Sequence, residues 1–306
     1  MSRELDLHDH MHKLDAAGDD LAALYAAGSA GAVALAFRAT DAMIGLPPVD
    51  PDLVRAASDK VLAALQRCGD AGEPGAWAMM AEAVAHADPD QALALWERGA
   101  TAGDDAARRS LVRNLWARRD HDALARIRPL LVAAVAAGRS SGLEERYLGW
   151  FAYHGIGCDR DLPASLQWQL AGAARGDADA MFELYALRST GQGCALDEAD
   201  AIQWCQRAAE AGSARAMSNL GGFHATGRGL PHDMERAVHW YRKAVDAGSG
   251  RAAANLGVMA ATGDGLPVDD AAARQWFARA EALGYPWWEM ADLAGLDPEA
   301  YAPTDE

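Results

Sequence analysis

Cysteines are few in this sequence and long apolar runs are missing, and both facts narrow the class of protein. The chain of 306 residues contains four cysteines at irregular spacing, which does not fit a disulfide framework. No apolar run approaches the roughly 20 residues that a membrane-spanning helix needs. Residues 1–20 are polar and charged, without the apolar core of a signal peptide. We therefore expect a cytoplasmic protein that does not enter a membrane.

Basic residues are also scarce relative to acidic ones. Lys and Arg number 28 against 44 Asp and Glu, which gives a formal net charge of −16. A general nucleic-acid binder normally carries a basic stripe along one face, so this class is not expected. The charge suits a soluble protein, or one that meets a basic partner. Runs of β-branched residues are scarce as well, while alanine, leucine and ten tryptophans supply helix propensity and bulk.

What the sequence does contain is one pattern that occurs four times between Leu148 and Gly284. Paired glycines recur every 36 residues, and an aspartate, a tryptophan and a closing glycine recur with the same step. A fixed period of about 20 to 50 residues is typical of a solenoid, whose units bury apolar surface against their neighbours. The markers are Gly155/Gly157, Gly191/Gly193, Gly227/Gly229 and Gly263/Gly265; Asp161, Asp197, Asp233 and Asp269; Trp168, Trp204, Trp240 and Trp276; and Gly176, Gly212, Gly248 and Gly284.

One unit, residues 213–248, shows how the pattern predicts two helices. Residues 227–231 (Gly-Arg-Gly-Leu-Pro) separate two apolar stripes, because glycine admits positive φ and proline cannot continue the hydrogen-bond ladder. Asp233 then precedes the second stripe as an N-cap. The unit is therefore predicted to be a helix–turn–helix hairpin. Its first stripe, at i, i+4 and i+7, consists of Ala216, Leu220 and Phe223.

The second helix of the unit alternates small and large residues at fixed positions. Trp240 lies in the middle of its apolar stripe, so we interpret the recurring tryptophans as core packing; an aromatic binding strip is the alternative. Gly221 follows Leu220 at a point where a Cβ would hold the two helices apart. Small residues recur where the paired helices should touch most closely, at Ser165, Ala201, Ala237 and Ala273.

At this point the residues resemble a known family, the Sel-one-like (Sel1-like) repeat, a relative of the tetratricopeptide repeat. The match is close in residues 177–212, 213–248 and 249–284 and good in residues 139–176. The resemblance implies an interaction scaffold or adaptor. The motifs that carry it are Ala216-Met217-Ser218-Asn219-Leu220-Gly221, Gly227 to Pro231, Ala237 to Ala244, and Ala247-Gly248.

The predicted fold is an all-α solenoid of about seven stacked antiparallel helix–turn–helix repeats, forming one domain over residues 1–306. Residues 1–138 contain degenerate repeats and an N-terminal cap, residues 139–284 four regular repeats, and residues 285–306 a C-terminal cap with a helix around Trp287 to Leu293. A tight turn is expected at residues 118–120 in place of a glycine loop. Units are expected to end at Gly28, Gly72, Gly103, Gly138, Gly176, Gly212, Gly248 and Gly284.

Two clusters could carry metal or catalytic chemistry, and we favour neither. His8 and His12 would share a helix face, with His10, Asp6 and Asp9 nearby, but a solvated segment is the preferred interpretation. A thiolate–imidazole pair is conceivable because His154 lies four residues before Cys158. We see no orienting third group and no oxyanion-hole motif, and interpret Cys158, Cys194 and Cys205 as buried small hydrophobes. We predict no enzyme, metal or cofactor.

The candidate binding site is the groove that the first helices would form. In tetratricopeptide-like hairpins the first helices line the concave surface, so the resemblance projects a set of groove positions. Arginine and aromatic residues are usual interface anchors, and Arg forks suit carboxylates; ordinary surface arginines and packing aromatics are the alternative. The candidate residues are Arg146, Trp150, Tyr153, His154, Phe182, Arg215, Ser218 and Arg251, and the other projected positions are Leu143, Asp179, Ala186, Gly222, Ala254 and Val258.

The resulting hypothesis is a non-enzymatic scaffold or adaptor that holds a segment of another protein in its groove. One alternative is an inhibitor or immunity-type protein that occludes a single target, guided to a basic surface by its acidity. The competing class is a lactam-type hydrolase, which the resemblance raises for cysteine-rich relatives. The chain lacks the paired cysteines of those relatives, so this class is disfavoured. Trp287-Trp288 is expected to seal the last repeat, with an exposed anchor as the alternative.

Overall fold

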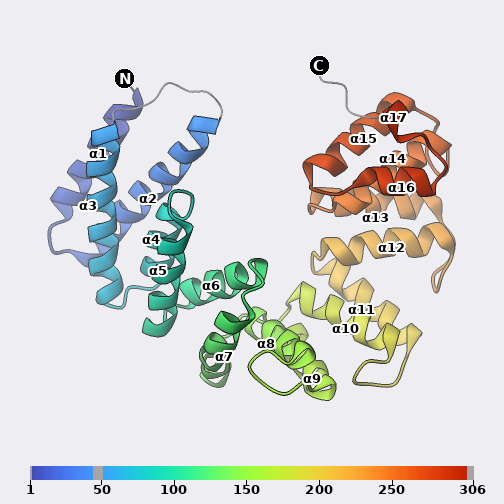
Figure 1. The fold of residues 1–306 in the computed structure, drawn as a ribbon, viewed down its shortest axis with the longest axis horizontal. Helices are drawn as coiled ribbons and strands as arrows, with labels where there is room; N and C mark the ends of the chain where they lie inside the picture. The colour runs from blue at the N-terminus through green and yellow to red at the C-terminus, as the bar shows by residue number, and fades with distance from the viewer. Residues whose placement is uncertain (1, 44–50, 302–306) are drawn as a thin grey trace. The chain divides into compact units, whose positions relative to one another are not determined.

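The computed structural model describes residues 2–43 and 51–301, with side chains described over residues 8–32 and 52–301. In this part of the chain every regular element is a helix and there is no strand, which confirms the all-α prediction (Figure 1). The chain divides into two compact units, Met1–Arg139 (unit 1) and Ser140–Glu306 (unit 2). Whether the two form one continuous solenoid stays a prediction.

Unit 1 begins with three helices that pack on one another and continues with two hairpins. Helices α1, α2 and α3 are in mutual contact, α4 pairs with α5, and α6 pairs with α7. The core includes the fully buried side chains of Leu65, Leu111 and Leu124. The helices are α1 (Ser2–Ala17), α2 (Leu21–Met43), α3 (Pro51–Asp70), α4 (Ala76–Val84), α5 (Pro89–Ala102), α6 (Asp105–Ala117) and α7 (His121–Ala136).

The turns of unit 1 agree with the sequence at some glycines and not at others. Gly103 ends α5 in the left-handed conformation, with φ of 93°, as expected. The tight turn between α6 and α7 is confirmed, and Arg119 adopts a positive φ of 55° there. The predicted unit end at Gly28 is wrong, because α2 continues through it. Gly28 instead permits close packing, since a Cβ there would lie 3.1 Å from the Leu65 side chain.

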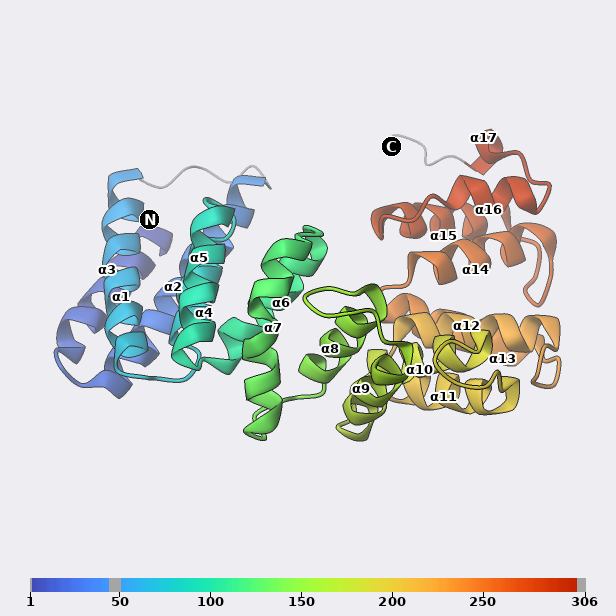
Figure 2. The ribbon, with the colours of Figure 1, turned by 60° about the horizontal axis from the view of Figure 1, so that its bottom comes forward.

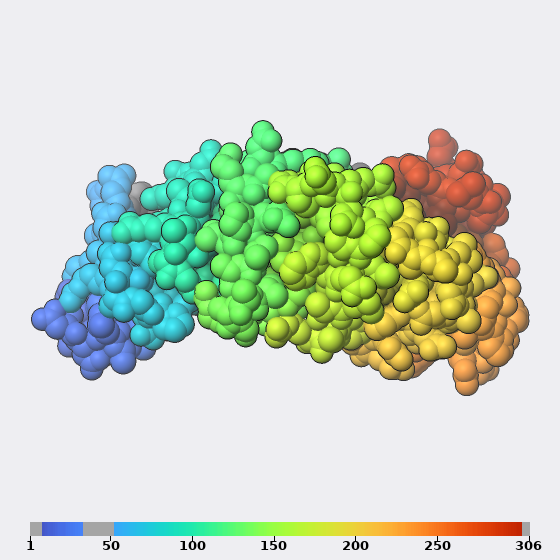
Figure 3. Space-filling view, turned by 90° about the horizontal axis from the view of Figure 1, so that it is seen from below, coloured from blue at the N-terminus to red at the C-terminus, as the bar shows by residue number. Residues whose placement is uncertain are grey.

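Unit 2 contains four hairpins followed by two short helices (Figures 1 and 2). Within each hairpin the two helices pack together, and the second helix contacts the first helix of the next hairpin. On the face drawn in Figure 3, side chains close the gaps that the ribbon leaves between these hairpins. The helices are α8 (Leu143–His154), α9 (Leu162–Ala174), α10 (Ala178–Thr190), α11 (Glu198–Glu210), α12 (Ala214–Thr226), α13 (Met234–Asp246), α14 (Gly250–Thr262), α15 (Asp270–Ala282), α16 (Trp287–Leu293) and α17 (Pro298–Tyr301).

The recurring aspartates and glycines fix the ends of these helices, as predicted. In each hairpin the aspartate carboxylate accepts a hydrogen bond from a backbone amide of the second helix; for Asp233 the donor is the amide of Arg236 at 2.9 Å. The first glycine of each pair ends the preceding helix with a positive φ, which L residues rarely adopt. The aspartate caps are Asp161, Asp197, Asp233 and Asp269, and the terminating glycines are Gly155, Gly191, Gly227 and Gly263.

One contact between the paired helices varies from hairpin to hairpin. A glycine of α12 faces a tyrosine of α13, and a Cβ on Gly221 would lie 2.6 Å from the Tyr241 ring. The same contact in the last hairpin joins Gly257 and Phe277, with a corresponding distance of 2.5 Å. In α10–α11 the bulky and small residues are exchanged, as Tyr185 and Cys205; in α8–α9 the positions hold Gly149 and Gln169. We call these four the register pairs.

The interpretation of the tryptophans as core residues is wrong in part. All four recurring tryptophans are only partly buried, while the residue that follows each one is buried. Trp240 packs against a core cluster that spans two hairpins, with Cys205 in the preceding hairpin and Leu220 in its own, and Lys243 Nζ lies 5.0 Å from its ring centroid. Adjacent helix positions differ by about 100°, so the two residues cannot face the same neighbour. Trp240 therefore packs where two hairpins meet, while Tyr241 takes the buried position against the first helix.

The C-terminal helix α16 covers the last hairpin, as the sequence predicts. Trp287 is buried and its ring stacks on Phe277, with centroids 4.5 Å apart. Trp288 is 49% exposed, so only the first of the two tryptophans seals the core. Over the described residues, no helix is both long enough and apolar enough to cross a membrane.

Candidate functional site

The first helices of unit 2 form the face on which the candidate residues lie. Helix α8 contacts α10, and α12 contacts α14, so first helices of successive hairpins are neighbours. Two pockets open along this face. Three candidate residues line the first pocket and two line the second: Trp150, Tyr153 and His154, and then Ser218 and Arg251.

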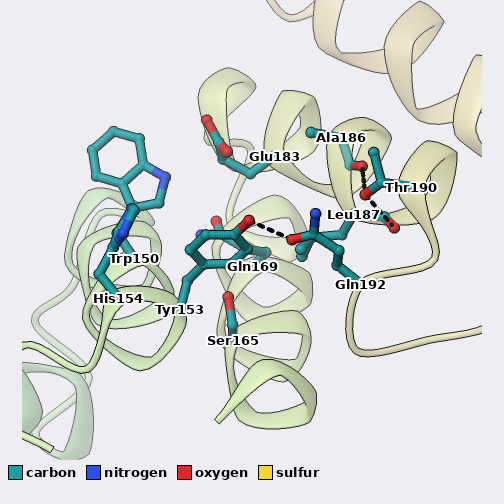
Figure 4. Close-up of a pocket in the computed structure, with 10 residues that line it drawn as sticks. All are labelled: Trp150, Tyr153, His154, Ser165, Gln169, Glu183, Ala186, Leu187, Thr190 and Gln192. Carbon is teal, nitrogen blue, oxygen red and sulfur yellow. Dashed lines mark hydrogen bonds between the residues drawn. The ribbon is translucent and has the colours of Figure 1, made fainter. Parts of the chain in front are cut away.

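The first pocket, which we call the α8–α10 pocket, has a volume of about 340 Å³. Aromatic side chains of α8 form one wall and α10 forms the other, as Figure 4 shows. The Tyr153 hydroxyl donates a hydrogen bond to the side-chain oxygen of Gln192 and so joins α8 to the loop that follows α10. The lining residues are Trp150, Tyr153, His154, Ser165, Gln169, Glu183, Ala186, Leu187, Thr190 and Gln192.

Gln169 is the buried polar residue of this pocket. Its side chain is 1% exposed and reaches α8 because Gly149 has no Cβ; a Cβ there would lie 2.4 Å from Nε2. Nε2 donates to the carbonyl oxygen of Arg146 at 3.2 Å, which fixes the orientation of the carboxamide. The other end, Oε1, is buried without a hydrogen-bond partner. This oxygen can therefore still accept a hydrogen bond from a bound group.

The second pocket, which we call the α12–α14 pocket, has a volume of about 430 Å³. Ser218 and Arg251 line it together with Tyr241, whose pKa is raised by burial. The guanidinium of Arg251 donates to Ser218 Oγ at 3.2 Å and to the side-chain oxygen of Asn219. The Arg251 side chain is thus held by neutral acceptors of the preceding first helix, and it remains exposed.

Two other candidate arginines already have carboxylate partners within the chain. Arg146 is buried and pairs with Asp177 at 3.1 Å and with Asp179 at 3.3 Å. Arg215 pairs with Asp179 at 3.4 Å and with Glu183 at 2.9 Å. We call these five residues the ion-pair ladder. The ladder links α8, α10 and α12, so its arginines connect neighbouring hairpins.

Phe182 lies beneath Arg215, with the guanidinium carbon 4.3 Å from the ring centroid. Trp150 stands in the same relation to Arg146 at 4.9 Å. Such cation–π contacts hold the arginine side chains over aromatic rings of the same face. The projected position Ala254 is fully buried and cannot face a groove, because α14 turns it toward its neighbours in the core.

Sequence reasoning missed the residues that complete the α8–α10 pocket. Gln169 comes from a second helix, Gln192 from a loop, and Glu183 from a position of α10 that the projection did not include. A signal for Gln169 was present. It is polar at the register position where later hairpins have Tyr241 and Phe277.

The next residues to place are the cysteines and the candidate metal ligands that the sequence raised. Cys205 is fully buried, and burial raises the pKa of its thiol to about 12. Cys158 and Cys194 are partly buried, and each thiol donates to backbone carbonyls of its own hairpin. Within the described side chains, no group of three His, Cys, Asp or Glu residues could hold a metal ion; the side chain of Asp6 lies outside them.

A family model for the Sel1 repeat matches five segments of the chain: residues 83–104, 145–177, 178–213, 214–249 and 250–285. Together the segments cover more than half of the sequence. The chain belongs to the Sel1 repeat family. Four of the matches coincide with the four hairpins of unit 2, and one lies in unit 1 over α5. Sel1 repeat proteins generally mediate interactions between proteins.

Solved structures with the same fold include a Sel1 repeat protein from Oxalobacter formigenes, with a TM-score of 0.61 at 22% identity, covering 89% of this chain and 79% of that one. A protective antigen of uropathogenic Escherichia coli with an SLR fold gives a TM-score of 0.56 at 18% identity, covering 93% and 61%. At these identities the likeness shows the fold alone. An immunity protein from Pseudomonas aeruginosa reaches only 0.38 at 14% identity, covering 84% and 83%, and carries no argument. No curated protein matches the sequence.

Proposed function

We propose that this Sel1 repeat protein is a non-enzymatic scaffold or adaptor that binds a segment of another protein along the face of α8, α10, α12 and α14. The main support is the pair of pockets, of about 340 and 430 Å³, that open on this face. Five of the eight residues projected from the sequence line them. An extended segment could place successive side chains in the two pockets.

The binding residues proposed here divide by burial. Trp150, Tyr153 and Phe182 offer partly buried rings, which are common interface anchors, and His154 and Arg251 are exposed. Arg146 is buried in its ion pairs, so its role is to position the Trp150 ring. A surface held by hydrogen bonds and ion pairs between hairpins is preorganised, and preorganisation lowers the entropy cost of binding.

The test is affinity capture from a lysate of the source organism, with Arg215→Glu combined with Arg251→Glu as the groove variant. The matched control is Arg207→Glu combined with Arg242→Glu, which makes the same charge change at exposed positions of the second helices α11 and α13. We expect a protein retained by wild type and by the control but lost with the groove variant. Circular dichroism melting must first show that both variants are folded.

Equal recovery from the groove variant and wild type would contradict the proposed surface. An inhibitor or immunity-type role makes a different prediction for the same experiment: one target, held in a stoichiometric complex and lacking its activity. A hydrolase would turn over a lactam substrate without a protein partner. Cys158, the candidate nucleophile of that class, is partly buried and its thiol donates to the backbone carbonyls of Phe151 and Ile156, which gives that class no support.

A further inference from the structure

The register pair of α8–α9 gives the α8–α10 pocket a buried polar wall that the other register pairs lack. In the last two hairpins an aromatic ring, Tyr241 or Phe277, fills the space against a glycine of the first helix. In α8–α9 the glycine is kept, as Gly149, but a carboxamide replaces the ring at Gln169. A carboxamide fills less volume than an aromatic ring, and the pocket of about 340 Å³ lies beside it.

The carboxamide of Gln169, which stands in place of the ring, also brings an unsatisfied hydrogen-bond acceptor to the wall of the pocket. Gln169 Oε1 is buried and has no partner, while Nε2 is held by the Arg146 carbonyl oxygen. A buried acceptor without a partner destabilises the folded protein, so its presence beside a pocket points to a ligand that satisfies it. A bound group with an N–H donor would satisfy it.

The remaining walls favour a flat cation as that donor. Tyr153 and Trp150 present aromatic rings, and Glu183 contributes a carboxylate. These rings already accept guanidinium groups of the chain itself: Arg146 lies over Trp150 at 4.9 Å and Arg160 over Tyr153 at 5.6 Å. The ion-pair ladder contains three carboxylates and two guanidiniums, so it keeps one negative charge. The chain as a whole carries −16.

We infer that the α8–α10 pocket binds an arginine side chain of the partner segment. This inference deepens the proposed function and depends on the same face. A guanidinium is planar, can stack on the Tyr153 ring, and carries five N–H donors in a fixed fork. One edge reaches Gln169 Oε1 and another faces Glu183. A lysine ammonium offers no flat surface to stack, and a carboxylate would meet Gln169 Oε1 and Glu183 as repulsive neighbours.

The test uses the full chain and a capped amino acid, Nα-acetyl-arginine methylamide, as the probe. Binding is followed by NMR through the indole N–H of Trp150, assigned with Trp150→Phe. We expect a saturable shift, and at least tenfold weaker binding of the citrulline analogue, which has the same shape without the charge. Equal binding of the arginine and citrulline probes, or tighter binding of the lysine probe, would overturn the inference.

Gln169→Met separates a binding role from a structural one. Methionine keeps the volume but cannot offer a carbonyl oxygen, so arginine binding should fall at least tenfold. The melting temperature should change little, because the substitution removes a buried unpaired acceptor together with the hydrogen bond that Nε2 donates to the Arg146 carbonyl oxygen. The matched control is Gln167→Met, at an exposed position two residues away on α9, which should bind normally. Unchanged binding by Gln169→Met would contradict the assignment. Weaker binding accompanied by a lowered melting temperature would contradict it as well, because the glutamine would then have a structural role.

A peptide-library experiment, together with the capped arginine, distinguishes failure of this inference from failure of the proposed function. Panning a library of random twelve-residue peptides against the full chain should enrich peptides with one essential arginine, sensitive to Gln169→Met. Enriched peptides that need Arg251 but no arginine of their own would keep the groove and overturn the pocket assignment. If the capped arginine binds but the groove variant captures the same proteins as wild type, the pocket assignment stands and the scaffold proposal fails.

Discussion

Hairpins α8–α9 and α14–α15 have the same backbone pattern and differ at the centre of their helix contact. In the last hairpin Phe277 is fully buried against Gly257, and Trp287 stacks on its other face. In hairpin α8–α9, Gln169 occupies the equivalent position against Gly149, and its Oε1 has no hydrogen-bond partner. The comparison teaches that the repeat sets the backbone while one side chain decides whether the centre of the helix contact is apolar or polar.

The largest expected effect tests the filled hairpin. Phe277→Ala should lower the free energy of unfolding of unit 2 by about 3–5 kcal/mol, because it removes a fully buried ring and leaves a cavity. Trp276→Ala, at the neighbouring and only partly buried position, should cost clearly less. Urea unfolding followed by circular dichroism measures both. A larger loss from Trp276→Ala would restore the tryptophans as the core of each hairpin.

A second prediction tests the glycine side of the register pairs. Gly221→Ala places a Cβ 2.6 Å from the Tyr241 ring, so the helices must separate or the ring must move. We expect a loss of about 1–3 kcal/mol despite the better helix propensity of alanine. In the background of Tyr241→Cys, which mimics the pair Tyr185–Cys205, the same change should cost much less. Simple additivity in this double-mutant cycle would show that the two positions are not coupled.

These contacts also mark how far the sequence alone could predict the fold. The 36-residue period predicted the hairpins, the cap at Asp233 and the helix end at Gly227, because those features depend on local chemistry that recurs. It failed at Gly28, because a glycine within a helix that packs closely on Leu65 looks the same in sequence as one that ends a helix. Trp240 was misplaced because its stripe also contains Tyr241, and only packing decides which residue faces inward.

The sequence also predicted the candidate site only in part. Register counting brought Trp150, Tyr153 and His154 to one pocket, because first helices repeat with a fixed phase. It could not foresee that Arg146 would be buried in ion pairs, since Asp177 and Asp179 belong to the next hairpin. Partners across hairpins depend on side-chain directions that a single-repeat pattern does not contain.

A third prediction concerns the exchanged pair Tyr185–Cys205 and alkaline pH. Burial raises the pKa of the Cys205 thiol from 9.0 to about 12, so the folded chain keeps the proton that the unfolded chain loses. This stabilisation is complete below pH 9 and decreases as the pH rises toward 12. Between pH 8 and pH 10 we expect Cys205 to account for a loss of about 1.4 kcal/mol.

Urea midpoints of wild type and Cys205→Ala at both pH values provide the measurement. The variant should be less sensitive to pH over this interval, whatever its stability at pH 8. Burial also raises the pKa values of Cys68, Tyr185 and Tyr241, and these groups contribute to the pH dependence from their unfolded-state values upward. Both proteins contain them, so their contribution cancels in the comparison. Equal pH sensitivity of the two proteins would mean that Cys205 ionises normally in the folded chain.

The smallest expected effect compares a turn of unit 1 with one of unit 2. Arg119 holds a positive φ of 55° after a helix end where unit 2 uses glycine, for example Gly176 after α9 with φ of 88°. A left-handed conformation costs an L residue roughly 1–2 kcal/mol, and the greater unfolded-state freedom of glycine offsets part of this. Arg119→Gly should therefore stabilise unit 1 by up to about 1 kcal/mol. The reciprocal change Gly176→Arg meets no atom within 4 Å and should destabilise unit 2 by a similar amount through φ alone. If differential scanning calorimetry shows Arg119→Gly to be destabilising, contacts of the arginine side chain stabilise that turn. The turns of unit 1 would then depend on side-chain contacts, where those of unit 2 depend on glycine.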